Sequence, residues 1–240
     1  LVSDANVLTA AQALAKAGVD LKHVTMCADD RGSIAAEVQK LKNDFDCVFT
    51  SGGVGPTHDD VTIKAVADAL NQKIVLNDIM AEHVREVMGD NFDQKSASLA
   101  FLPEGTKLNY PRPDPESKFT PWPILQVDNV FILPGVPDIF RKKIETITTE
   151  GMLAISSKPL TLRVIHLDLL EVDVMSAIAS IEDKAAQEGV DVGVYEMKGG
   201  DAVSSRVTLR GRESAAVDDL QEKLISNIGL QHVLSVENNE

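Results

Sequence analysis

The chain carries, at residues 49–62, the stretch FTSGGVGPTHDDVT, which joins the end of an apolar strand to the start of a helix. Residues 47–49 have the apolar character of a buried strand, and the apolar residues within 63–70 recur at helical spacing. A backbone without Cβ atoms can turn with positive φ and approach a ligand closely. Amide groups before a helix N-terminus also favour an anion. The residues expected to provide this turn are Gly52, Gly53 and Gly55.

Two adjacent carboxylates, Asp59 and Asp60, follow the glycines, with the hydroxyls of Thr57 and Thr62 close by in sequence. Either aspartate could cap the helix, which is the commoner role for an aspartate in this position. If the turn holds a phosphate, however, two carboxylates would repel it unless a cation lay between them, and Mg²⁺ is commonly held by carboxylates together with substrate phosphates. We therefore expect Asp59 and Asp60 to bind a divalent metal and to act in catalysis. His58 could contact a phosphate or be an exposed loop histidine without a role.

Helical and strand patterns alternate along the first half of the chain. The periodicity predicts helices over 7–18 and 34–45 and strands over 23–28 and 46–50. This order predicts an α/β fold with a mainly parallel sheet and helices on both faces. Ligands bind such sheets at the carboxyl ends of the strands, which is where the glycine turn lies.

A second apolar strand, over 130–133, ends at Pro134-Gly135. We expect Pro134 and Gly135 to form a second wall of the same pocket, although the segment is equally compatible with a helix start that has Pro137 in its first turn. Before it, residues 124–133 predict a hairpin that turns at Asp128-Asn129. Five prolines within 109–123 predict a surface excursion. Trp122 could stack on a ligand base, but packing against the body of the domain is the preferred interpretation.

Several of these motifs together resemble a known family. The run from Gly52 to Thr62 and the block FILPGVP at 131–137 are similar to the molybdopterin-binding-like (MoCF) superfamily, in the branch of bacterial CinA-type proteins and the N-terminal domain of eukaryotic FAD synthase. The segment between the blocks agrees through Lys95, Pro103-Glu104-Gly105 and Asn109-Tyr110-Pro111. The resemblance covers residues 1–155 well, with the FAD synthase domain the closer relative, and implies a phosphate contact for Lys95. It also implies that the family's first strand is missing, because the chain opens at Leu1-Val2-Ser3-Asp4.

The composition of the chain excludes some classes of binding partner. The formal net charge of -14 over 240 residues argues against nucleic acid or an anionic membrane as partner. No apolar run is long enough to cross a membrane, and no signal peptide is visible, so we expect a cytoplasmic protein. Cys27 and Cys47 lie in predicted strands without metal-ligand spacing and are expected to be buried, reduced thiols.

Residues 156–240 change in character. The pattern predicts strand 161–167, helix 174–185, strands 190–195 and 203–209 and helix 217–228, a small βαββα module. Nothing in it points to catalysis. We expect a packing or dimerisation role, which is compatible with a homo-oligomer.

The predicted site contains the parts needed to polarise a diphosphate and to direct a water molecule at phosphorus. From the resemblance, the expected activity is a metal-dependent nucleotide diphosphatase that hydrolyses FAD to FMN and AMP, or ADP-ribose, with Mg²⁺, Mn²⁺ or Co²⁺. One alternative is a module that binds molybdopterin or a nucleotide without catalysis, in molybdenum-cofactor assembly. Another is a regulatory domain of FAD synthase.

Overall fold

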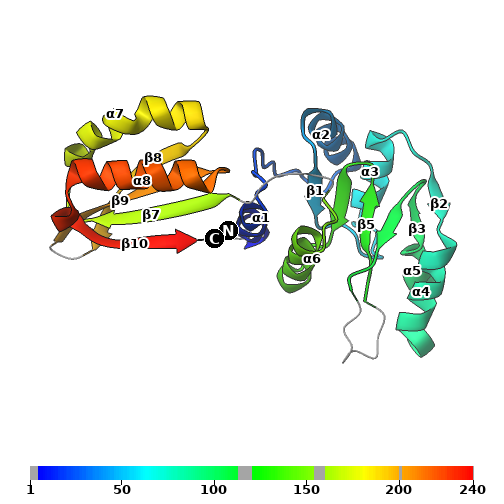
Figure 1. The fold of residues 1–240 in the computed structure, drawn as a ribbon. Coiled ribbons are helices and arrows are strands. Elements are labelled where there is room, and N and C mark those ends of the chain that lie inside the picture. Colours follow the sequence, from blue (N-terminus) through cyan, green and yellow to red (C-terminus); the bar gives the residue numbers. More distant parts are fainter. Residues whose placement is uncertain (1–4, 113–120, 154–159, 200–201, 240) are drawn as a thin grey trace. The chain divides into compact units, whose positions relative to one another are not determined.

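The chain divides into two compact units in the computed structural model, which describes residues 5–112, 121–153, 160–199 and 202–239 (Figure 1). Unit 1 comprises residues 1–13 and 21–155, and unit 2 comprises residues 14–20 and 156–240. Most of the predicted proline-rich excursion, including Pro113 and Pro115, lies outside the described residues. In the part of the chain that is described, no helix has both the length and the apolar character needed to cross a membrane.

Unit 1 contains short strands separated by helices. Its elements are α1 (Ala5–Lys16, which continues into unit 2), α2 (Arg31–Asp44), β1 (Val48–Ser51), α3 (Thr62–Ala69), β2 (Ile74–Leu76), α4 (Asp78–Met88), η1 (Gly89–Asn91), α5 (Gln94–Ser98), β3 (Phe101–Pro103), β4 (Lys107–Asn109), β5 (Ile124–Val127), β6 (Val130–Leu133) and α6 (Pro137–Thr149). The predicted helices α1, α2 and α3 and the hairpin β5–β6 are confirmed.

The main sheet of unit 1 is mixed, with the strand order β1-β6-β5-β4. Strand β1 runs parallel to β6, with Val48 opposite Val130, whereas the β5–β6 and β4–β5 pairs are antiparallel. The expectation of a mainly parallel sheet was therefore wrong for the described strands. The cause is the tight turn between β5 and β6, where Asp128 has φ 54°, because a turn this short can join only antiparallel neighbours. A second, two-stranded sheet pairs β2 with β3.

The predicted strand over 23–28 does not form. This segment contains no strand or helix, and its side chains are exposed, with Met26 at 75% of its maximal exposure. Its β-branched and apolar residues suggested a strand, but a strand also needs a neighbour to pair with. Cys27 is exposed, which corrects its predicted burial, whereas Cys47 is partly buried. Burial, with a smaller contribution from Asp46, raises the pKa of Cys47 to about 12.

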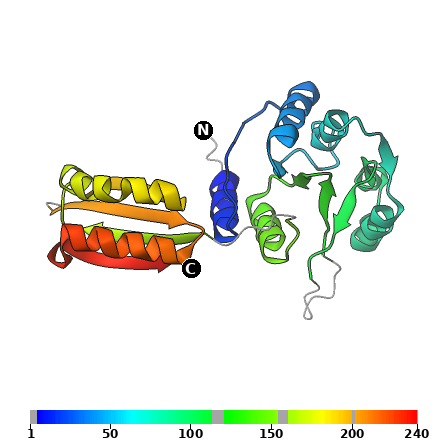
Figure 2. The same ribbon diagram turned by 45° about the horizontal axis from the view of Figure 1, so that its top comes forward.

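The two faces of the main sheet pack against different helices. Val130 and Ile132 of β6 point toward a core that also contains buried residues of α2, α3 and α4. The alternate residue, Phe131, points to the other face, where it stacks on Phe49 with ring centroids 5.4 Å apart. Helix α6 lies on the side of the sheet away from α3 and α4, as Figures 1 and 2 both show. Helices on both faces leave the strand ends as the accessible part of the sheet.

Unit 2 is an antiparallel sheet in the order β10-β7-β9-β8. Its elements are β7 (Thr161–Leu167), α7 (Glu171–Glu188), β8 (Asp191–Gly199), β9 (Ala202–Gly211), α8 (Ser214–Ile228), η2 (Leu230–His232) and β10 (Val233–Asn239). Helices α7 and α8 lie side by side on one face (Figures 1 and 2). The predicted βαββα order lacked the last strand: β10 pairs with β7 and makes the unit βαββαβ. The segment that forms β10 is mostly exposed and polar, so its pattern indicates a strand only weakly.

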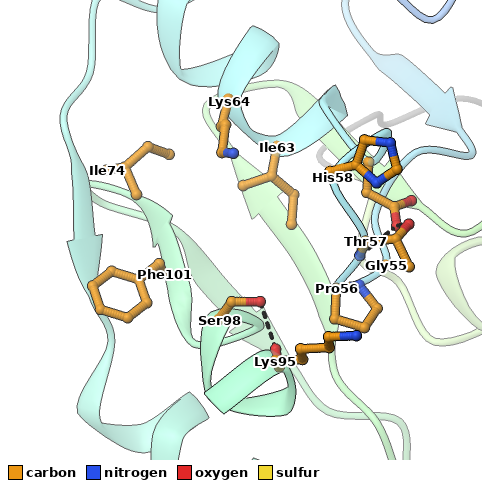
Figure 3. Close-up of a pocket in the computed structure, with 11 residues that line it drawn as sticks. Gly55, Pro56, Thr57, His58, Ile63, Lys64, Ile74, Lys95, Ser98 and Phe101 are labelled. Atoms are coloured by element: carbon orange, nitrogen blue, oxygen red, sulfur yellow. Dashed lines mark hydrogen bonds between the residues drawn. The ribbon is translucent and has the colours of Figure 1, made fainter.

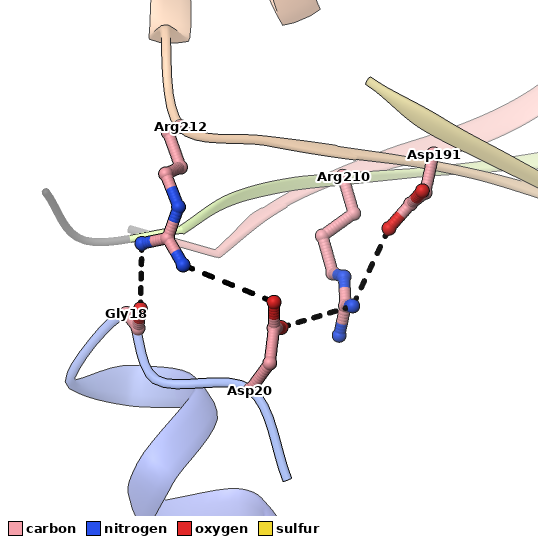
Figure 4. A network of polar contacts seen from close by, with 5 residues as sticks. All are labelled: Gly18, Asp20, Asp191, Arg210 and Arg212. Carbon is pink, nitrogen blue, oxygen red and sulfur yellow. Dashed lines mark hydrogen bonds and ion pairs between the residues drawn. The ribbon is translucent and has the colours of Figure 1, made fainter. Parts of the chain in front are cut away.

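Charged side chains tie residues 18–20 to the sheet of unit 2 (Figure 4). A guanidinium nitrogen of Arg210 lies 3.2 Å from a carboxylate oxygen of Asp20 and 3.4 Å from one of Asp191. Arg212 donates a hydrogen bond of 2.6 Å to the backbone carbonyl of Gly18. Arg210 and Arg212 therefore hold residues 18–20 against the sheet of unit 2.

Candidate functional site

The glycine turn follows β1 directly. Gly52 and Gly53 have φ of 100° and 64°, a backbone conformation that side-chain-bearing residues rarely adopt. The amide of Gly52 donates to Leu133 of β6 at 3.0 Å, and the carbonyl of Gly53 accepts from the amide of Thr62 at 3.0 Å. A Cβ on Gly53 would collide with the hydroxyl of Thr62. The turn is thus fixed between the strand β6 and the start of α3.

Gly55 is required for a different reason from the one expected. The φ of Gly55 is not positive, unlike those of Gly52 and Gly53. A Cβ at position 55, however, would lie 2.6 Å from a carboxylate oxygen of Asp60. That oxygen accepts hydrogen bonds from the Thr57 amide at 3.0 Å and from the Thr57 hydroxyl at 2.5 Å. The absent side chain at position 55 leaves the space into which the carboxylate folds.

Neither Asp59 nor Asp60 caps α3. The helix begins at Thr62 with Val61 as its N-cap and no side-chain capping bond. Because the carboxylate of Asp60 is turned back onto Thr57, it stabilises the loop instead of the helix, which corrects the capping alternative.

Both carboxyl groups remain ionised at neutral pH. The Thr57 hydroxyl is the largest influence on Asp59 and lowers its pKa, and the backbone amide of Asp59 adds to this effect. For Asp60, burial opposes ionisation, but hydrogen bonds from the Thr57 side chain and from the backbone of Gly55 and Thr57 outweigh it and lower the pKa. His58 is fully exposed, with its Nδ1 atom 3.8 Å from an Asp59 oxygen.

The two predicted strand ends meet. A Cβ on Gly135 would lie 3.1 Å from the Cα atom of Gly52. The side-chain amide of Asn6, in α1, donates to the Ser51 hydroxyl and to the Gly135 carbonyl, both at 2.9 Å. Asn6 was missed by the sequence analysis, since a single asparagine in a helix gives no motif.

A cavity of about 660 Å³ opens beside the loop (Figure 3). It lies between the 55–60 loop, the first turn of α3, strand β2 and the α5–β3 region. Its lining residues are Gly55, Pro56, Thr57, His58, Asp60, Ile63, Lys64, Ile74, Lys95, Ser98 and Phe101. The size is in the range of small-molecule sites.

The predicted site residues fall into two groups. Gly55, Thr57, Asp60 and Lys95 line the cavity, and Asp59 is the neighbour of Asp60 in the same loop. The other predicted residues surround the strand ends and are not among those that line this cavity; they are Gly52, Gly53, Thr62, Pro134 and Gly135. Whether these residues bind a ligand stays a prediction.

Two lysines reach the cavity from different helices. Lys64 lies in α3 and Lys95 in α5. Neither lysine forms an ion pair with another described residue, although the charge of Lys95 contributes to the lowered pKa of Asp93, two residues earlier. Sequence reasoning singled out Lys95 but missed Lys64, Ile74, Ser98 and Phe101. The polar face of a helix and the first residue of a short strand carry no signal that would separate these residues from solvated ones.

Trp122 has a packing role, as preferred from the sequence. Its ring meets the His83 ring edge-on at 5.1 Å between centroids, and its backbone carbonyl accepts a hydrogen bond of 3.1 Å from the Lys143 ammonium. Lys143 also donates to the Pro123 carbonyl at 2.8 Å. Burial lowers the pKa of Lys143 to about 8 and also lowers the pKa of His83.

Comparisons with known proteins agree with this architecture. The chain is 24% identical over 235 residues to a protein named "Probable FAD synthase" from Caenorhabditis briggsae, covering 90% of this chain and 45% of that protein. It is 33% identical over 177 residues to a CinA-like protein of Desulfosudis oleivorans, covering 67% of this chain and 41% of that protein. The chain therefore spans less than half the length of these two relatives.

A solved structure shares the fold. The protein CinA of Thermoplasma acidophilum, described as having unknown function, matches 62% of this chain and 88% of its own with a TM-score of 0.53 and 22% identity. The family described as "Probable molybdopterin binding domain" matches residues 1–153, which contain the glycine loop, both strand ends and the cavity. The chain belongs to this molybdopterin-binding (MoCF) domain family, with distant homology to FAD synthase and CinA-like proteins.

Proposed function

We propose that unit 1 binds a nucleotide diphosphate of the FAD or ADP-ribose type and hydrolyses it with a divalent metal, releasing AMP. The observation that carries this proposal is the cavity, which brings a glycine loop and the Asp60 carboxylate together with Lys64 and Lys95. Two cations without ion-pair partners among the described residues, in a chain of net charge -14, favour an anionic ligand at this place.

The carboxylates suit a metal that the substrate helps to hold. No group of three His, Cys, Asp or Glu side chains that could hold a metal ion occurs in the described part of the chain. Asp59 and Asp60 nevertheless offer two ionised carboxylates in one loop, and Mg²⁺ is often held by one or two carboxylates plus substrate phosphates. When bound, Mg²⁺, Mn²⁺ or Co²⁺ would polarise the phosphate for attack by water.

The remaining lining residues bind and orient the substrate in this proposal. The ammonium groups of Lys64 and Lys95 neutralise phosphate oxygens, a role that suits the point charge of lysine. Thr57 keeps both aspartates ionised through its hydroxyl, so that they stay ready to act without a change in protonation. The similarity to proteins named FAD synthase supports a flavin dinucleotide as one substrate.

AMP release tests this proposal directly. Purified protein is incubated with FAD or ADP-ribose and with Mg²⁺, Mn²⁺ or Co²⁺, and AMP is quantified by chromatography. We expect metal-dependent release that falls by roughly 100-fold or more in Asp60→Asn, because charge stabilisation in the transition state is lost. Asp44→Asn is the matched control, since Asp44 is an exposed aspartate of unit 1 that does not line the cavity. A fully active Asp59→Asn, Asp60→Asn double variant would rule out the metal-dependent mechanism.

A second function, binding without catalysis, has its own supporting observation. Asp60 already accepts two hydrogen bonds from Thr57, which suits a carboxylate whose task is to shape the loop. In that case the domain would hold molybdopterin or a nucleotide, or act as a regulatory domain of a larger flavin-forming enzyme. Nucleotide binding by the wild type with no AMP release under any of the three metals would favour this alternative.

A further inference from the structure

The cavity has a polar end and an apolar end. Figure 3 shows Gly55, Thr57 and His58 on one side and Ile74 with Phe101 on the opposite side. The polar end is formed by a loop after β1, whereas the apolar end is formed by β2 and the first residue of β3. A ligand that fills this cavity must therefore be polar at one end and apolar at the other.

Phe101 stands out within its own strand. The next residues of β3, Leu102 and Pro103, are buried, but Phe101 keeps 48% of its exposure. Its cross-strand neighbour Leu76 is also exposed, at 49%, so the ring is not part of the core. An aromatic ring left accessible on a cavity wall offers a flat face on which another ring can stack.

The two lysines place the charge of the ligand. In Figure 3, Lys64 lies at the top of the cavity and Lys95 at the bottom, with Phe101 to the left of both and the polar loop to the right. Even with the Asp60 carboxylate on the same wall, the two ammonium groups leave the cavity with a net positive charge, which favours an anionic group such as a phosphate. A diphosphate between them would leave its organic substituent next to Ile74 and Phe101.

We propose that Phe101 is a specificity-determining residue, which stacks on the planar base of a nucleoside diphosphate whose phosphates lie between Lys64 and Lys95. This inference rests on the proposed function for its ligand class, but it concerns recognition and not the hydrolytic step. It assigns an aromatic contact to a residue that no motif points to. It also predicts that the site distinguishes nucleotides from inorganic diphosphates.

Two ligands that resist hydrolysis separate these contributions. α,β-Methylene-ADP carries the base, ribose and diphosphate, whereas methylenediphosphonate carries only the diphosphate. Dissociation constants are measured by calorimetry with Mg²⁺ for the wild type, Phe101→Leu, Phe101→Trp and Lys95→Ala. Phe101→Leu keeps an apolar side chain on the strand but removes the aromatic face.

We expect Phe101→Leu to bind α,β-methylene-ADP roughly tenfold more weakly and methylenediphosphonate unchanged within about twofold. Phe101→Trp should retain nucleotide binding, whereas Lys95→Ala should weaken both ligands. Ile79→Ala is the control, because Ile79 is a 63% exposed apolar residue of unit 1 that does not line the cavity.

The outcomes distinguish the two proposals. Equal loss of both ligands in Phe101→Leu, or no loss of either, would overturn the stacking role, as would a wild type that binds the nucleotide no better than methylenediphosphonate. Absence of AMP release from FAD and ADP-ribose, with Phe101-dependent nucleotide binding intact, would overturn the proposed hydrolysis and leave the stacking role standing.

Discussion

Unit 1 and unit 2 surround the most buried cations among their described residues in different ways. In unit 2, Arg163 is 6% exposed and its Nε atom lies 2.9 Å from a carboxylate oxygen of Asp218 in α8. In unit 1, Lys143 is 8% exposed, and its ammonium donates hydrogen bonds to the two backbone carbonyls of Trp122 and Pro123. Removing a charge from water is costly; an opposite charge recovers part of this cost by direct attraction, and neutral carbonyls recover less of it.

The contrast extends to the exposed cations. Arg210 of unit 2 contacts Asp20 and Asp191, while Lys64 and Lys95 of unit 1 face a cavity without an ion-pair partner in the described residues. The contrast is local to the cavity, because other cations of unit 1 do form ion pairs: Arg31 pairs with Asp68, and Lys42 pairs with Asp128. The cavity is therefore the place in unit 1 where an anionic ligand is expected.

The largest expected effect comes from the core of unit 2. Leu209 of β9 is fully buried, so Leu209→Ala should lower the free energy of unfolding by about 2–5 kcal/mol. Denaturant unfolding measures this change. Binding of α,β-methylene-ADP under native conditions should stay within twofold of the wild type. Val172→Ala, at a 71% exposed position, is the control. A loss of binding in Leu209→Ala while the protein is still folded would break the division of roles between the units.

A smaller effect concerns Lys143 and its pKa of about 8. Between about pH 8 and pH 10.5 the unfolded chain binds the proton that the folded protein has released, so stability should rise with pH over this window. A difference of roughly 2.5 pH units corresponds to about 3 kcal/mol. Unfolding free energies at pH 7.5 and pH 10.5 measure the rise, which Lys143→Met should abolish and Lys142→Met, at an exposed neighbour, should keep. If the unfolding free energy of Lys143→Met rises with pH as much as that of the wild type, the burial of Lys143 is not the cause of the rise.

Next in size is the loop. In Gly55→Ala the new Cβ would lie 2.6 Å from the Asp60 carboxylate, which must then leave its place beside Thr57. We expect about tenfold weaker binding of α,β-methylene-ADP, which corresponds to roughly 1.4 kcal/mol, with little change in melting temperature. Gly32→Ala is matched, since its Cβ would make only an ordinary contact of 3.5 Å with Asp30. Undiminished binding by Gly55→Ala would mean that the position of Asp60 does not matter to the ligand.

The smallest effect is expected at the surface of unit 2. Arg210 is a 40% exposed partner of Asp20 and Asp191, and pairs of this kind contribute about 0–1 kcal/mol. Arg210→Ala should therefore change the free energy of unfolding by less than about 1 kcal/mol, and the change should shrink further in 1 M salt. A loss above about 2 kcal/mol in denaturant unfolding would show that the charged contacts of unit 2 are structurally decisive.

The sequence predicted the elements of unit 1 that have strong periodicity, together with the hairpin at Asp128-Asn129. It did not predict the direction of every strand. Periodicity describes which face of a strand is buried, but parallel and antiparallel neighbours bury the same faces. Two predictions were wrong in opposite ways: a strand was expected at 23–28 and does not form, whereas β10 was not expected and forms. Pairing depends on the presence of a neighbouring strand and not on local composition alone.

The candidate site was predictable where a residue type has few other uses. Glycines and paired aspartates in one loop are rare enough to notice, and Gly55, Thr57 and Asp60 do line one cavity. Lys64 and Phe101 were not predictable, because a helical lysine and a strand phenylalanine are ordinary residues until the fold turns them toward the same space. The reason for Gly55 was also hidden, since steric room for a carboxylate five residues later leaves no local signature.

The pairing of β1 with β6 has a consequence for how the protein acquires its structure. These strands lie far apart in sequence, with Val48 opposite Val130, whereas β8 and β9 of unit 2 follow each other directly. Closing a long loop costs more chain entropy than forming a hairpin and slows folding. The loop that bears Asp60 follows β1, and the Gly52 amide at its start donates a hydrogen bond to the Leu133 carbonyl of β6, so we expect the loop to take its final position only after β1 and β6 have paired. In refolding followed by pulsed hydrogen exchange, we therefore expect the amides of β8 and β9 to gain protection before those of β1, so that ligand-binding competence is among the last properties to emerge.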